Sequence, residues 1–287
     1  MKKLMFAATV AAAMAGFAVE SQVVGYKNHE VNPGVYNMWV AGFLPVDKPE
    51  SQVVLGDITA NSTFKFGTDT IMTLTSVGRT DKVYTYLTAE EGEAYNCAAG
   101  WYDYAFVNAE IPGVDEWDWE SQIPDEYCGN DMTLPYGTMI IVQSGYAGAT
   151  LNYAGKVLQG DDYRFYIEPG VYNMLGNATP VNRTLGAFTA NSTFKFGTDT
   201  IMTLTSVGRT DKVYTYLTAE EGEAYNCTAG WYDYAFVNAE IPGVDEWDWE
   251  SQIPDEYCGN AMPVDAGTGF IVQSGYDGAY IDLPKAL

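Results

Sequence analysis

The sequence contains little of what catalysis and nucleic-acid binding usually require. Its 287 residues include one histidine, and 14 Lys and Arg stand against 38 Asp and Glu, a formal charge of −24. Because phosphate backbones are bound by clustered Lys and Arg, this balance argues against nucleic acid and against anionic membrane surfaces. A Ser-His-Asp or Cys-His site would have to use His29, and no phosphate-binding loop or H-E-x-x-H motif occurs. We therefore expect no enzyme, no catalytic residues and no resident cofactor.

Long hydrophobic runs are also missing beyond the N-terminus. Lys2 and Lys3 precede the apolar run Leu4–Phe17, which is shorter than the ~20 residues needed to span a membrane. This layout predicts a bacterial signal peptide over residues 1–18, cleaved after Ala18, with cleavage after Ala15 as an alternative. Its removal leaves 12 basic and 38 acidic residues, or −26. We expect a secreted or cell-surface protein without membrane insertion.

What the sequence does contain is an internal repeat. The segments Thr59–Asn130 and Thr189–Asn260 have the same 72-residue sequence and differ only where Ala98 is replaced by Thr228. Outside this window the copies diverge, although the Pro-Gly-Val-Tyr-Asn-Met motif at 33–38 recurs at 169–174. We expect repeat 1 over residues 19–158 and repeat 2 over 159–287. A recent duplication alone would leave such identity; alternatively, the shared middle carries two equal binding or packing faces. The divergent ends are where one copy would meet the other.

Residue periodicity within each copy favours β-strands. Segments 63–67 and 70–75 alternate, and a turn at 78–81 before 82–87 predicts a hairpin. Gly100–Val107 also alternates, and Thr138–Gln143 is a short apolar run suited to a buried strand. Outside the signal peptide, no segment carries apolar residues at helical spacing over three turns. The fold class expected is all-β, as two tandem, near-identical β-sandwich or barrel-like domains.

The four cysteines repeat one spacing. Cys97 and Cys128 lie 31 residues apart, as do Cys227 and Cys258. For an exported protein this predicts one disulfide within each copy.

Aromatic and acidic residues gather between the two cysteines of each copy. Three readings give them a function: tryptophans stacking on sugar rings, carboxylates holding Ca²⁺, or a carboxylate pair acting on a glycoside. A fourth places the tryptophans in the core beside a solvated acidic edge that discourages aggregation. The candidate glycan-binding residues are Trp101, Trp117, Trp119, Trp231, Trp247 and Trp249. The candidate metal ligands are Asp115, Glu116, Asp118, Glu120, Asp245, Glu246, Asp248 and Glu250.

Short motifs at the ends of the copies add a resemblance. Ala18–Ser21, Val23–Tyr26, Pro33–Asn37 and Gly267–Gln273 resemble uncharacterised secreted bacterial β-repeat proteins, although the first copy departs from the last motif at residues 137–140. The resemblance implies secretion and a β fold, and it brings no site residues.

Together these features predict a secreted or cell-surface structural protein. Its partners would be copies of itself or other surface proteins, met through β edges or aromatic faces in fibres or a surface layer. The alternatives are a tandem carbohydrate-binding protein and a Ca²⁺-stabilised surface or adhesion module.

Overall fold

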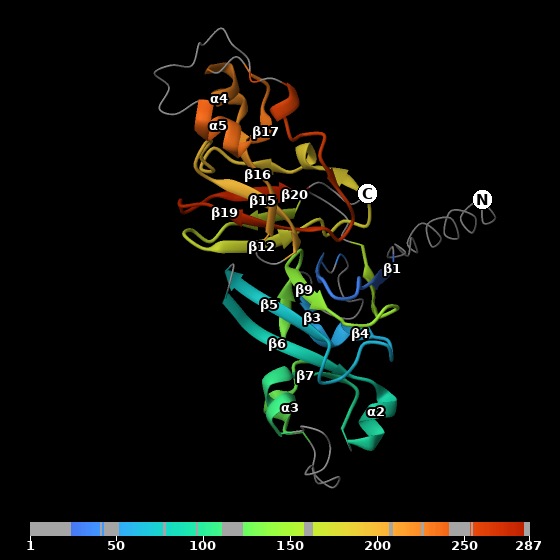
Figure 1. The fold of residues 1–287 in the computed structure, drawn as a ribbon. Helices are drawn as coiled ribbons and strands as arrows, with labels where there is room; N and C mark the ends of the chain where they lie inside the picture. Colours follow the sequence, from blue (N-terminus) through green and yellow to red (C-terminus); the bar gives the residue numbers. More distant parts are fainter. Residues whose placement is uncertain are drawn as a thin grey trace, which may run out of the picture.

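The computed structural model describes residues 24–40, 42, 52–76, 79–95, 97–110, 123–157, 163–206, 209–224, 227–240, 253 and 255–283. Over these residues the chain is mainly β, and one set of sheets occurs twice (Figure 1). The prediction of a mainly β protein with a duplicated pattern is therefore confirmed.

Each repeat contributes the same succession of strands and two short helices. Repeat 1 contains β1 (Val24–Glu30), β2 (Tyr36–Val40), β3 (Gln52–Val54), β4 (Ile58–Ala60), β5 (Thr70–Ser76), β6 (Arg79–Leu87), α2 (Ala89–Ala94), β7 (Gly100–Asp103), α3 (Tyr104–Glu110), β8 (Thr133–Pro135), β9 (Met139–Gln143) and β10 (Thr150–Lys156). Repeat 2 contains β11 (Tyr163–Tyr166), β12 (Tyr172–Gly176), β13 (Arg183–Thr184), β14 (Thr189–Ala190), β15 (Thr200–Ser206), β16 (Arg209–Leu217), α4 (Ala219–Ala224), β17 (Gly230–Asp233), α5 (Tyr234–Glu240), β18 (Pro263–Val264), β19 (Gly269–Gln273) and β20 (Tyr280–Leu283).

The strands of each repeat form three antiparallel sheets. In repeat 1 the orders are β2-β9-β5-β6-β7, β1-β10-β4 and β3-β8; in repeat 2 they are β12-β19-β15-β16-β17, β11-β20-β14 and β13-β18. The predicted hairpin is present as β5–β6, where Met72 pairs with Val83. Its second strand begins at Arg79, earlier than the turn residues had indicated.

A hydrophobic core lies between the five-stranded and the three-stranded sheet of each repeat. In repeat 1, Ile140 and Val142 of β9 share this core with Leu151 and Tyr153 of β10. In repeat 2, Phe270 and Val272 of β19 pack with Ile281 and Leu283 of β20. Side chains alternate across a strand, so the neighbouring residues Met139, Ile141 and Ile271 point to the other face of each sheet. That face is also buried, which explains why β9 reads as a continuous apolar run rather than an alternating one.

The second faces of the two five-stranded sheets pack against each other. β2 contacts β15 and β5 contacts β12, while β9 and β19 meet between them. This reciprocal pattern is that of a two-fold arrangement of the two repeats, with α2 and α3 at one end of the molecule and α4 and α5 at the other (Figure 1). The shared apolar cluster comprises Val40, Tyr136, Met139, Met174, Ala178 and Ile271, with Met38, Tyr163, Tyr172 and Met202 packed against it.

Most of the apolar cluster between the repeats lies outside the identical windows. Of the ten residues in the cluster, Met202 alone falls within the identical 72-residue windows. For the described residues, the expectation that one copy meets the other through its divergent ends is therefore confirmed only in part. The identical windows contribute β5 and β15 to the contact, while their helices lie at the two far ends of the molecule (Figure 1).

One predicted strand turns into a helix. Gly100–Val107 begins as β7, but α3 starts at Tyr104. The carboxylate of Asp103 accepts a hydrogen bond from the backbone N–H of Phe106 at 3.0 Å, as a residue capping a helix start does. The same occurs at Asp233 and Phe236. The prediction of a strand is therefore wrong beyond residue 103, because the alternating aromatic pattern hid a local capping signal.

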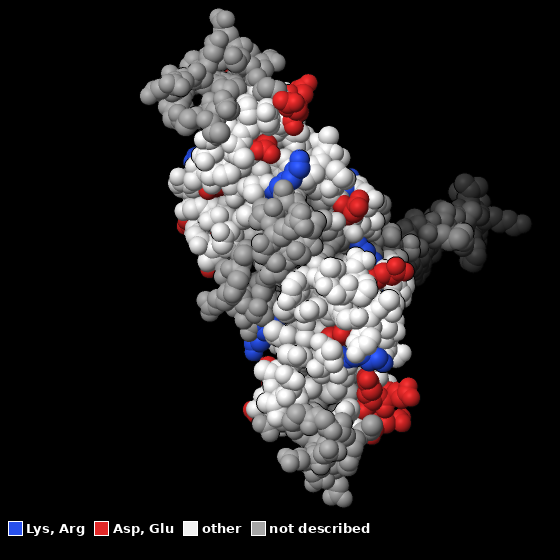
Figure 2. All heavy atoms as spheres, in the orientation of Figure 1, with Lys and Arg blue, Asp and Glu red and all other residues white. Residues whose placement is uncertain are grey.

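The surface carries its charges unevenly. On the face drawn in Figure 2, Lys and Arg side chains are scattered singly, and acidic side chains gather beside the helical ends. Among the described residues, no helix has the length and apolar character needed to cross a membrane.

Candidate functional site

Trp101 and Trp231 are core residues. Both are 0% exposed, and the Nε1–H of each donates to a backbone carbonyl, at 2.7 Å to Ile58 and 2.8 Å to Phe188. A ring that is buried on both faces cannot stack on a sugar. Their prediction as glycan-binding residues is therefore wrong, and the alternative that placed tryptophan in the core is correct for these two.

The remaining tryptophan and acidic candidates fall in segments 111–122 and 241–252, outside the described residues. These are Trp117, Trp119, Trp247, Trp249, Asp115, Glu116, Asp118, Glu120, Asp245, Glu246, Asp248 and Glu250. Their roles in glycan or Ca²⁺ binding stay predictions. Among the described residues, no group of three His, Cys, Asp or Glu side chains is placed to hold a metal ion.

The structure contains no disulfide among the described cysteines, which corrects the predicted pairs Cys97–Cys128 and Cys227–Cys258. Cys97 Sγ instead donates to the carbonyl of Tyr95 at 3.2 Å and accepts from the N–H of Ile123 at 3.1 Å. Both cysteines of repeat 1 border a small cluster around Leu87, Tyr102 and Val107. They therefore serve as small, partly buried packing groups, a role that equal spacing cannot distinguish from a disulfide.

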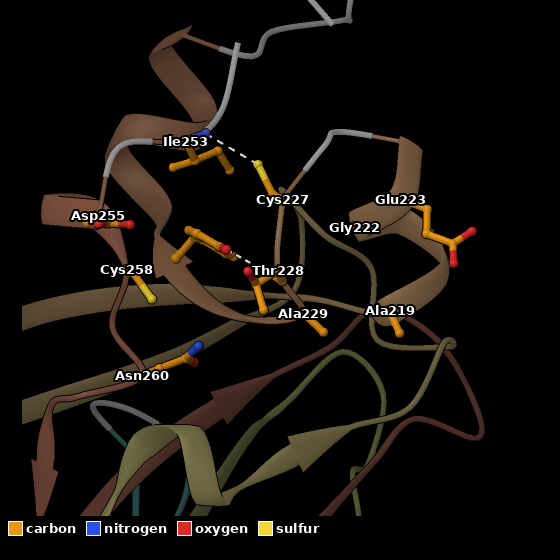
Figure 3. Close-up of a pocket in the computed structure, with 11 residues that line it drawn as sticks. Ala219, Gly222, Glu223, Cys227, Thr228, Ala229, Ile253, Asp255, Cys258 and Asn260 are labelled. Carbon is orange, nitrogen blue, oxygen red and sulfur yellow. Dashed lines mark hydrogen bonds between the residues drawn. The ribbon is translucent and has the colours of Figure 1, made fainter. Parts of the chain in front are cut away.

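The cysteines of repeat 2 line a pocket of about 840 Å³. Figure 3 shows Cys227 and Cys258 on different segments of its wall, with Asn260 below them. Tyr232 Oη donates to the carbonyl of Thr228 at 2.6 Å. Burial, with Cys258, Cys227 and Asp255 nearby, raises the pKa of Tyr232 to about 12, so the phenol stays protonated and continues to donate. The described part of the wall thus combines two cysteine side chains, a protonated phenol and the side chain of Asn260.

Buried carboxylates outside this pocket fix loops. Asp69 is 1% exposed and accepts from Ser144 Oγ at 2.6 Å, from the N–H of Gly145 at 3.1 Å and from the N–H of Lys65 at 2.9 Å. Asp199 makes the same bonds in repeat 2. Each carboxylate thus accepts three hydrogen bonds from donors of the fold, which explains how Asp can be buried here and gives it a role in fixing the loops.

His29 lies in the sheet of repeat 1 beside the inter-repeat contact. Its ring stacks on the buried Trp39, with centroids 5.6 Å apart. Its Nε2 atom is buried without a hydrogen-bond partner among the described residues. Burial and, secondarily, the charge of Lys27 lower the pKa of His29 to about 4. In repeat 2 the equivalent residue, 136 positions on, is Phe165, so both repeats place a flat ring at this position.

Since the pKa of His29 in the folded chain, about 4, lies below its ordinary value of 6.5, the unfolded chain binds the proton more readily between these two pH values. The contribution of His29 to stability is therefore present above pH 6.5 and is lost as the pH falls toward 4, by on the order of 3 kcal/mol. We expect the single histidine signal in NMR to titrate near pH 4. We also expect His29→Phe, the residue of repeat 2, to unfold with a shallower pH dependence between 4 and 6.5. A histidine that titrates near 6.5 would contradict this prediction.

Within the described ranges, the exposed aromatic residues are tyrosines. Tyr26 and Tyr166 are 67% and 73% exposed on the outer faces of the three-stranded sheets, and Tyr146 and Tyr276 occupy equivalent loops of the two repeats. Beside Tyr166, Arg164 forms a bidentate ion pair with Asp282 and covers the ring of Tyr280 at 3.7 Å. Reasoning from the sequence singled out the tryptophans and did not identify these tyrosines. The alternation of side chains along β1 and β11 places Tyr26 and Tyr166 on the solvent-exposed face of the sheet and could have indicated them.

Comparisons of this chain with protein-family models, curated proteins and solved structures find no match. The function therefore has to be argued from the chain itself.

Proposed function

We propose that this protein is an exported structural protein that associates with copies of itself at the bacterial surface. In this proposal each repeat is a β-sandwich whose core lies between its five-stranded and three-stranded sheets. The repeats are building blocks, and neither carries out a reaction.

The contact between the two repeats supports the proposal, because in it one copy of the repeated sequence binds the other copy. The two repeats meet through equivalent faces of equivalent sheets, which is how two identical subunits meet across a two-fold axis. The contact is apolar and rich in methionine, and Tyr136 Oη also donates across it to the carbonyl of Ala178 at 3.0 Å. A unit with such a face needs no other partner to build a larger assembly.

The buried polar groups agree with this role. Asp69 and Asp199 hold loops, and the side chain of Asn37 donates to the carbonyls of Asn32 and Val35 at 3.0 and 3.1 Å. These bonds make a rigid block, which suits a structural protein.

Light scattering and electron microscopy of the mature chain test the proposal directly. We expect the mass to rise with protein concentration and the micrographs to show fibres or layers. The measurement is repeated with calcium and with EDTA, because the acidic residues within 115–120 and 245–250 are predicted Ca²⁺ ligands. Monomers alone under every condition would contradict self-association.

Carbohydrate binding is the second candidate, and Tyr166 favours it. An exposed aromatic ring beside the Arg164–Asp282 ion pair offers a face for a sugar ring and polar groups for its hydroxyls. The equivalent positions of repeat 1 are Asn28, Glu30 and Asn152, so the two repeats would not bind the same sugar. Slowed migration of the protein in gels containing a neutral polysaccharide would support this candidate.

A further inference from the structure

We propose that two chains assemble by exchanging repeats, so that repeat 1 of one chain packs on repeat 2 of another through the inter-repeat face. This inference rests on the proposed self-association and names the surface that carries it. The occupant of the face is a second copy of this chain.

The first reason is that the face fits one repeat to the other and not to itself. A Cβ built on Gly269 of repeat 2 would overlap Met139 of repeat 1. A Cβ on Gly176 would lie 2.5 Å from Cγ2 of Val40 and 2.3 Å from the carbonyl oxygen of Thr268, so both repeats restrict this position. Position 269 is the equivalent of 139, and position 176 is the equivalent of 40. Repeat 1 therefore carries the large residue and repeat 2 the glycine at both places.

Pairing of like repeats is disfavoured for the same reason. Two copies of the repeat 1 face would place Met139 and Val40 where the native contact has glycine, and overpacking of this kind costs about 1–3 kcal/mol. Two copies of the repeat 2 face would leave the space empty and lose the packing contacts. The surface thus specifies a contact between unlike repeats, which a second chain satisfies as well as the same chain does.

The polar contacts across the face follow the same rule. The N–H of Val40 donates to the carbonyl of Gly267 at 3.0 Å, and the ammonium group of Lys27 donates to the carbonyl of Ala266. Phe165 of repeat 2 packs onto Gly137 of repeat 1. Each of these contacts joins unlike repeats, so each would be re-formed between chains.

Each repeat also has a core of its own, and the segment between them is short. The main clusters of repeat 1 and repeat 2 are separate, and β10 ends at Lys156 while β11 begins at Tyr163. A short connection keeps the two faces of one chain at an effective concentration in the millimolar range. We therefore expect the closed monomer at low concentration and exchange when folding occurs near that range. If two chains exchange repeats reciprocally, every inter-repeat face is paired and a closed dimer results. If each chain pairs with the next one only, an unpaired face remains at each end and the assembly grows into a fibre.

A pair of cysteines across the face tests the proposal. A Cβ at position 269 would lie 3.2 Å from Cβ of Met139, close to the ~3.5–4.5 Å separation in a disulfide. Gly269 does not have a positive φ, so its backbone accepts cysteine once Met139 is shortened. All variants carry serine at the four native cysteines. The chain with both M139C and G269C should cross-link internally, which verifies its folding and the geometry.

The decisive sample mixes two chains, one with M139C and the other with G269C. Refolding them together near millimolar concentration should give a covalent heterodimer, at least about tenfold more abundant than after refolding at micromolar concentration. Chains with M139C alone should not cross-link, because like repeats do not pair. Assembly in light scattering without the covalent heterodimer would overturn repeat exchange and leave self-association standing. If neither heterodimer nor assembly forms, both proposals fail.

Discussion

Replacing Trp101 with alanine is expected to lower the free energy of unfolding by about 3–5 kcal/mol. The ring is fully buried and lies edge-on to Phe64 and Tyr86, at centroid distances of 5.7 and 4.9 Å. Its loss leaves a cavity in the core of repeat 1. It also removes the donor to the carbonyl of Ile58, and an unpaired buried acceptor adds to the cost. Denaturant unfolding followed by circular dichroism measures the change.

Repeat 2 provides a matched experiment. Trp231 has the same partners in Phe194 and Tyr216, at 5.7 and 4.9 Å, so Trp231→Ala should cost the same within error. Trp101→Phe keeps most of the volume and should cost less than either alanine variant. A loss below about 1 kcal/mol in Trp101→Ala would mean that the ring is not in the core.

Gly137→Ala is expected to destabilise the protein by about 3 kcal/mol, by combining backbone strain with a clash between the repeats. Gly137 has φ of +79°, a conformation that glycine alone adopts readily. The added methyl group would also overlap the ring of Phe165, which belongs to the other repeat and cannot move aside easily. Thermal unfolding measures the loss.

Gly34 separates the two causes. It has φ of +74°, and a Cβ there would meet no atom within 4 Å, so Gly34→Ala should show the strain alone, about 1 kcal/mol. At Gly267, with φ of +83°, the new methyl group would meet the flexible end of Lys27, and an intermediate loss is expected. Equal losses at positions 137 and 34 would show that Phe165 does not press on Gly137.

Much of the fold could be predicted from the sequence because repetition and alternation are local signals. The identical windows required two copies of one structure, and the apolar run before Gln143 required a buried strand. The strand at Gly100 was predicted four residues too long, because the hydrogen bond from Phe106 to Asp103 is a single local contact within an alternating pattern.

The roles of the candidate site residues were harder to predict, because the exposure of a side chain depends on which face of its strand is covered by another sheet. Trp101 stands among acidic and aromatic residues in the sequence, yet its strand turns it into the core. The fit of Met139 to Gly269 depends on two strands 130 residues apart, and no pattern within either strand reveals it. The cysteine spacing fits a disulfide and a packing role equally well, so spacing alone could not decide between them.

The division between identical middles and divergent ends has a genetic consequence. Recombination between the two halves of the gene can homogenise the 72-residue windows without harm, because these windows already differ only at residues 98 and 228, neither of which belongs to the apolar cluster between the repeats. The same event at position 139 or 269 would oppose methionine to methionine or glycine to glycine. Selection on this contact therefore limits how far the two halves can be made alike, and places that limit at the ends of the repeat.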